Sequence, residues 1–217
     1  MQESEMDLLR YHDLIAGIVA AMEARAPLTA QHSLRVAAMT ECICGLLAFP
    51  ADAKAVYHIA AHLHDVGKIG IPDAILFKKG ALTKEEWATI RRHPVIGYEI
   101  LRSIDCFAAV ADIVLHHHER YDGTGYPDGL SGEHIPVCSR IIAIADSIDA
   151  MLSRRSYRAA ISEEQCRVEL SIQKSSMYDP AITGIVLAHW PLIMRARNSV
   201  LPAGKDAKRR TGAQRHE

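Results

Sequence analysis

Residues 56–73 read Val-Tyr-His-Ile-Ala-Ala-His-Leu-His-Asp-Val-Gly-Lys-Ile-Gly-Ile-Pro-Asp, and this stretch sets the pattern for the chain. Its apolar residues recur every three or four positions, which predicts a helix that ends near His64. Gly67, Gly70 and Pro72 then break that helix. The same spacing continues through nearly the whole sequence, and we find no sustained period-two alternation of the kind typical of strands. We therefore predict an all-α fold.

Several helix boundaries follow from local signals in the sequence. Thr29 stands ahead of a long apolar run and is a candidate N-cap. Residues 83–86 (Thr-Lys-Glu-Glu) and 162–165 (Ser-Glu-Glu-Gln) have the pattern of capping boxes. Pro94 stands where a new helix is expected to begin. The glycines and prolines of residues 121–136 predict a structured loop.

The composition is that of a foldable globular chain. Of 217 residues, 49% are hydrophobic and 24% are charged, and the formal net charge is −1, which excludes a disordered or low-complexity protein. The five cysteines are odd in number and scattered, which favours reduced thiols and a cytoplasmic location. The apolar run at residues 14–22 is far short of the roughly 20 residues that a membrane span needs. We expect no membrane span in this chain.

Composition divides the chain into three parts. Residues 1–26 suggest an N-terminal helix that continues a linker from an upstream region or supports a homodimer, although packing onto the core explains its apolar side equally well. Residues 27–194 form one helical domain. Residues 195–217 carry seven Lys/Arg against two acidic residues and predict a basic, disordered tail. Because this tail lacks aromatic residues, we expect no binding to duplex nucleic acid.

Histidines are unusually frequent in this sequence. There are 12, and eight of them lie between His58 and His134. His64 and Asp65 follow an apolar helix and are followed by Val66-Gly67-Lys68, so two metal-ligand side chains and an ammonium group emerge at one helix end. This arrangement suits a metal site with a phosphate contact. For a His-Asp pair alone, a histidine that interacts with the helix dipole is the simpler interpretation.

Other acids and imidazoles make the metal interpretation stronger. Asp146 lies in a helix that is apolar on almost every side, so its carboxylate must be paired or bound to metal, and Asp149 three residues later can support a ligand histidine. Residues 116–118 are three consecutive histidines at another helix end, and at most two can face one site. With His93 and His32, the set has the mixed nitrogen and oxygen donors of a two-metal hydrolase.

These residues carry a family resemblance. His64-Asp65 with Gly67-Lys68, together with His32 and Asp146, resembles the HD phosphohydrolase superfamily. Residues 117–127, which read His-His-Glu-Arg-Tyr-Asp-Gly-Thr-Gly-Tyr-Pro and are called the signature loop below, resemble the signature of its HD-GYP branch. The resemblance covers most of residues 14–190. It implies an HD-domain helical bundle and makes residues 27–194 the catalytic domain.

The resemblance implies a cytoplasmic bacterial enzyme that hydrolyses cyclic di-GMP with two divalent metal ions, iron or manganese first and nickel or zinc as alternatives. The positions that hold the first metal are His32, His64, Asp65 and Asp146. Those that hold the second are Asp65, His93, His117 and His118, with Asp65 bridging. Asp65 and Lys68 are the expected catalytic residues, and Asp149 supports a ligand. The expected substrate contacts are Lys68, Arg155, Arg158, Asp122, Gly123, Gly125 and Tyr126.

The expected product is the linear dinucleotide, formed by hydroxide that the two metals generate, with a second cut to GMP left open. Two alternatives stay open: hydrolysis of cyclic GMP-AMP, and a weakly active binding module that signals to diguanylate cyclase-type proteins. Some family members hold a third metal through a glutamate four residues before the first ligand histidine. Leu28 occupies that position here, and because leucine cannot coordinate a metal, we predict a binuclear centre.

Overall fold

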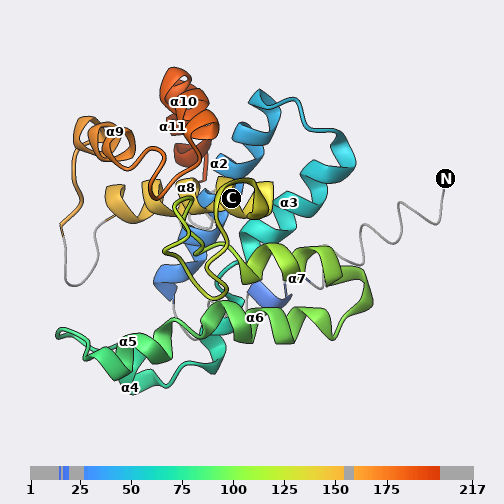
Figure 1. The fold of residues 1–217 in the computed structure, drawn as a ribbon, viewed down its shortest axis with the longest axis vertical. Helices are drawn as coiled ribbons and strands as arrows, with labels where there is room; N and C mark the ends of the chain where they lie inside the picture. The colour runs from blue at the N-terminus through green and yellow to red at the C-terminus, as the bar shows by residue number, and fades with distance from the viewer. Residues whose placement is uncertain (1–14, 16, 20–26, 154–158, 201–217) are drawn as a thin grey trace, which may run out of the picture.

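The computed structural model describes residues 15, 17–19, 27–153 and 159–200, and all regular elements within them are helical (Figure 1). The predicted all-α fold is confirmed. The described helices are α2 (Pro27–Leu46), α3 (Ala51–Leu63), η1 (Val66–Gly70), α4 (Asp73–Leu76), α5 (Lys84–Ile90), α6 (His93–Arg102), η2 (Asp105–Phe107), α7 (Ala108–Leu115), η3 (Gly132–His134), α8 (Val137–Leu152), α9 (Glu163–Ile172), α10 (Pro180–Ala188) and α11 (Trp190–Asn198).

The core forms where α2 meets its neighbours. This helix packs against α3, α8 and α11, and α3 packs in turn on α7 (Figure 1). Ile43 of α2, Leu63 of α3 and Ile148 of α8 are fully buried in one continuous hydrophobic cluster. Because α2, α3, α7 and α8 share this core, the polar groups at their ends and on their inner faces are held in fixed relative positions.

Local chemistry explains most helix boundaries. The capping boxes predicted at residues 83–86 and 162–165 are both present, at the starts of α5 and α9. Pro94 lies in the first turn of α6, as predicted. The N-cap predicted at Thr29 is wrong, because Thr29 lies inside α2, which the structure describes from Pro27 onward.

The predicted boundary between domain and tail differs from the structure. Helix α11 continues past residue 194 to Asn198, because Arg197 on this helix bonds to a buried carboxylate in α8. Residues 201–217 of the predicted tail, and almost all of residues 1–26, lie outside the described residues. All five cysteines are free thiols. Within the described residues, no helix is both long and apolar enough to span a bilayer.

Candidate metal centre

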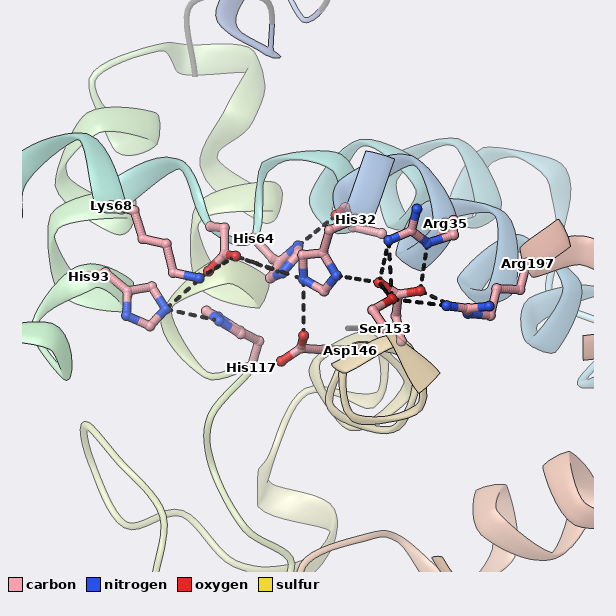
Figure 2. Close-up of polar contacts among 12 residues, drawn as sticks. His32, Arg35, His64, Lys68, His93, His117, Asp146, Ser153 and Arg197 are labelled. Carbon is pink, nitrogen blue, oxygen red and sulfur yellow. Dashed lines mark hydrogen bonds and ion pairs between the residues drawn. The ribbon is translucent and has the colours of Figure 1, made fainter. Parts of the chain in front are cut away.

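The seven predicted metal ligands lie at helix ends and on the inner faces of two helices. His64 caps the C-terminus of α3, His93 opens α6, and His117 and His118 follow the last residue of α7. The donor atoms of six of the seven, all but Asp146, form two groups, and within each group all three atoms lie inside 4.8 Å of one another. Figure 2 shows His32 and His64 of the first group and His93 and His117 of the second. These groups are the first cluster, His32, His64 and Asp65, and the second cluster, His93, His117 and His118.

Asp65 belongs to the first cluster and also approaches the second. Its Oδ2 is 3.4 Å from Nε2 of His64 and 3.9 Å from Nε2 of His32, whereas its Oδ1 is 3.5 Å from Nε2 of His93. The Asp65 side chain is only 3% exposed, so its negative charge needs a cationic partner. Lys68 is one such partner, with Nζ 2.6 Å from Oδ2. One oxygen therefore faces each cluster, as a carboxylate that bridges two cations requires.

Hydrogen bonds fix the orientation of the ligand imidazoles. In three of them Nδ1 contacts a backbone carbonyl oxygen three residues earlier, and since a carbonyl only accepts, Nδ1 must carry the proton. These contacts join His64 to Ala61 (2.8 Å), His93 to Ile90 (2.8 Å) and His117 to Val114 (2.6 Å). The other ring nitrogen, Nε2, is therefore unprotonated, and its lone pair is available to a metal ion in the site.

These unprotonated nitrogens fit a cation. Nε2 of His93 and Nε2 of His117 lie 3.3 Å apart, so two lone pairs face each other. Burial lowers the pKa of His93 to about 4 and that of His118 to about 3, which disfavours a proton as the neutralising charge. Nε2 of His64 is also buried and has no hydrogen-bond partner among the described residues. A metal ion bound by neutral imidazoles satisfies all of these atoms.

His32 lies between two carboxylates. Its Nε2 is 3.1 Å from Oδ1 of Asp146, and its Nδ1 is 2.8 Å from Oδ2 of Asp149 (Figure 2). Burial acts to lower the pKa of His32, but the hydrogen bonds to the two carboxylates outweigh it and raise the pKa to about 9. A metal ion at Nε2 would therefore have to displace a proton. Asp146, which its apolar helix predicted to be paired, has His32 as a partner. Its side chain is 20% exposed, whereas that of Asp149 is fully buried.

The signature loop covers the second cluster. Oε1 of Glu119 accepts hydrogen bonds from the backbone amides of Asp128 (2.7 Å) and Gly129 (3.0 Å), which closes the loop on itself. Gly125 is required because a Cβ atom there would collide with the backbone at residues 119 and 120. This close approach places the ring of Tyr126 in a stack on His118, with centroids 5.0 Å apart.

Other predicted contact residues have varied positions. Asp122 is an exposed residue whose carboxylate accepts from Arg120 and from the amide and hydroxyl of Thr124, so it stabilises the loop itself. Gly123 has a φ of 80°, which favours glycine. Arg155 and Arg158 lie outside the described residues. His116, the first of the three consecutive histidines, bonds to Asp128 at 3.0 Å and belongs to neither cluster, so only two of the three reach the site, as the helix geometry predicted.

Sequence reasoning missed the groups that surround Asp149. Arg35 donates to both oxygens of this carboxylate, at 2.6 and 2.9 Å, and Arg197 donates to Oδ1 at 2.8 Å. Ser153 also donates, at 3.3 Å. One signal was available, because Arg35 follows His32 by three residues and so shares its helix face. No local pattern points to Arg197, which the composition assigned to a disordered tail.

Comparison with known proteins identifies the family. Residues 18–182 match the HD domain, and the chain belongs to this family. The 3'3'-cGAMP-specific phosphodiesterase 2 of Vibrio cholerae is 40% identical over 190 residues, which are 87% of this chain and 36% of that protein. The cyclic di-GMP phosphodiesterase response regulator RpfG of Xanthomonas campestris is 40% identical over 180 residues, which are 82% of this chain and 48% of that protein.

A solved structure supports the fold. Bd1817, a HDG"Y"P protein from Bdellovibrio bacteriovorus, matches with a TM-score of 0.61 and 18% identity, over 75% of this chain and 54% of that chain. The resemblance drawn from the signature motifs is therefore confirmed at the level of the family and its helical fold. This chain spans less than half the length of the two curated relatives described above.

Proposed function

We propose that this chain is a metal-dependent phosphodiesterase that hydrolyses a cyclic dinucleotide, with cyclic di-GMP as the preferred substrate. The observation that carries the proposal is the position of Asp65, which directs one oxygen to each of two histidine clusters. The relatives described above, named for hydrolysis of 3'3'-cGAMP or cyclic di-GMP, support the substrate class.

The two clusters, together with Asp146 beside His32, provide a donor set for two divalent ions. When bound, two such cations would lower the pKa of a metal-bound water to about 7 and polarise a phosphoryl oxygen. Imidazole and carboxylate donors suit iron and manganese, with nickel and zinc as alternatives. The proposed ligands of the first ion are His32, His64, Asp65 and Asp146, and those of the second are Asp65, His93, His117 and His118.

The protein's own groups fix the geometry of the reaction. The carbonyl contacts at Nδ1 prevent rotation of the ligand rings, and the stack of Tyr126 on His118 keeps that ring under the signature loop. Lys68 is bonded to Asp65 and its side chain is 28% exposed, so its ammonium can also meet a phosphate oxygen of the substrate. These contacts orient a phosphodiester and offset the negative charge that develops on it.

A cyclic dinucleotide carries a second phosphate, which needs cations away from the metal centre. Arg155 and Arg158 are the proposed partners, together with loop residues from Asp122 to Tyr126. Cleavage of one phosphodiester gives the linear dinucleotide. A second cut to GMP requires the linear product to bind again at the same centre.

The test is turnover of each dinucleotide by the reconstituted protein. Protein loaded anaerobically with iron(II) or manganese(II) is incubated with cyclic di-GMP or cyclic GMP-AMP, and products are separated by chromatography. We expect faster conversion of cyclic di-GMP to the linear dinucleotide. Faster conversion of cyclic GMP-AMP would contradict the substrate preference. Full metal occupancy without turnover of either would favour the binding module and its diguanylate cyclase-type partners.

Adjacent histidines provide a matched pair of variants for this test. His117→Asn removes a ligand of the second cluster, and we expect loss of one metal and of turnover. His116→Asn changes the neighbouring imidazole, which belongs to neither cluster, and we expect both metals and turnover to remain. Equal effects of the two substitutions would contradict the assignment of ligands.

A further inference from the structure

The C-terminal helix α11 reaches the metal centre through one buried carboxylate. Asp149 of α8 is fully buried, and side chains from two other helices, α2 and α11, donate hydrogen bonds to it. Its Oδ1 accepts from Nε of Arg197 at 2.8 Å, and its Oδ2 accepts from Nδ1 of His32 at 2.8 Å. Arg35 bonds to both oxygens, and Figure 2 shows the three donors converging.

The guanidinium of Arg197, like that of Arg35, donates to more than one acceptor. Nη2 of Arg197 donates to Oγ of Ser153 at 2.9 Å while Nε donates to Asp149, so its planar fork engages two acceptors on α8 and at its C-cap. The arginine side chain is only 15% exposed. Such charge-assisted bonds are short and strong in a site removed from water, and they fix the direction of the carboxylate.

The direction of this carboxylate decides which nitrogen of His32 can bind metal. When Asp149 accepts the proton of Nδ1, Nε2 is left to face Asp146 and Asp65. Without the guanidinium of Arg197, the Asp149 carboxylate could rotate, because one of the hydrogen bonds to its Oδ1 would be lost. The negative charge of Asp149 would then be shared by Arg35 and His32 alone among the cationic partners. The imidazole would then lose its fixed tautomer and orientation.

We propose that Arg197 is a positioning residue of the metal centre, which acts through Asp149 to hold His32 in the orientation that binds the first ion. The inference rests on the metal ligands of the proposed function and extends them to α11. It makes the last turn of this helix part of the functional unit. Outer partners of this kind change metal affinity by about 10- to 100-fold.

The test is titration of metal-free protein with manganese(II), followed by calorimetry, for wild type and two variants. Arg197→Gln removes the guanidinium, and we expect one of the two metal affinities to fall by about 10- to 100-fold while the other stays unchanged. Arg195→Gln removes an exposed charge from the same helix, and we expect both affinities to remain. Since no nucleotide is present, the result does not depend on whether the protein hydrolyses cyclic dinucleotides.

Two outcomes would overturn the proposal. One is an Arg197→Gln protein with both affinities equal to those of wild type. The other is a parallel fall of both affinities, which would indicate a general structural role. Should this variant fail to fold, Arg197→Lys keeps the charge but not the planar pair of donors. We expect Arg197→Lys to lower the affinity for that same ion by a smaller factor. An unchanged affinity would contradict the role of Arg197.

Discussion

Gly67 is the position where one added methyl group is expected to damage the metal centre without altering a ligand. A Cβ atom there would collide with the carbonyl oxygen of His93 and would lie 2.5 Å from the backbone nitrogen of Gly97. Ordinary contact begins at 3.4 Å, so in Gly67→Ala the backbone of α6 must move away by about 0.9 Å at Gly97 and by more at His93. His93 opens this helix and moves with it.

The size of this shift sets the expected loss. Metal–ligand distances tolerate only about 0.2 Å, so a displaced His93 no longer meets the ion that Asp65 also binds. A misplacement of about 1 Å can cost about 100-fold in rate. Overpacking of this kind also costs about 1–3 kcal/mol in the free energy of unfolding.

The assay measures bound metal per chain, turnover of cyclic di-GMP and the melting temperature. For Gly67→Ala we expect loss of one metal, a fall in turnover of about 100-fold and a lower melting temperature. Gly184→Ala in α10 is the control, because its Cβ would meet only Nζ of Lys174 at 3.9 Å. A Gly67→Ala protein with wild-type metal content and turnover would refute the reasoning.

Three further predictions concern the surroundings of the site. Asp149→Asn removes the charge that pairs two buried guanidiniums, and denaturant unfolding should show a loss of about 3–5 kcal/mol; wild-type stability would contradict this. Glu119→Ala leaves two loop amides without their acceptor, so kinetics should show reduced turnover with both metals retained, and loss of metal would contradict the assigned role. Metal-free protein should melt at a lower temperature at pH 5 than at pH 7. Burial holds the pKa of His93 near 4 and that of His118 near 3, below the unfolded value of 6.5, so the unfolded state binds more protons in this window. The pKa of His32 is raised to about 9, so its contribution is fully present below pH 6.5; an unchanged melting temperature would contradict the prediction.

Helix ends were the most predictable part of the fold, because neighbouring residues determine them. Thr83 and Ser162 each form a capping box with the residue three positions later, Glu86 and Gln165. Both members of each box can therefore be recognised in the sequence. The same holds for His64 and His93, which stand at helix boundaries that glycine and proline define. Five of the seven candidate ligands lie at or beside such boundaries, whereas His32 and Asp146 lie within α2 and α8.

The rest depends on contacts that a local pattern does not contain. Arg197 and Asp149 are 48 residues apart, and Arg35 and Asp149 are 114 apart, so their pairing arises only when α2, α8 and α11 pack together. The burial of Asp149, which exceeds that of Asp146, is likewise set by neighbouring helices. For this reason the sequence nominated the candidate ligands but not the groups that hold them in place.

The central claim is a binuclear centre in which both ions share Asp65. Its most direct test is to count bound manganese(II) per chain and to record the electron paramagnetic resonance spectrum of the loaded protein. We predict two ions per chain with an exchange-coupled signal, and loss of the coupling in Asp65→Asn. Two uncoupled ions, or a third ion despite Leu28, would contradict the account.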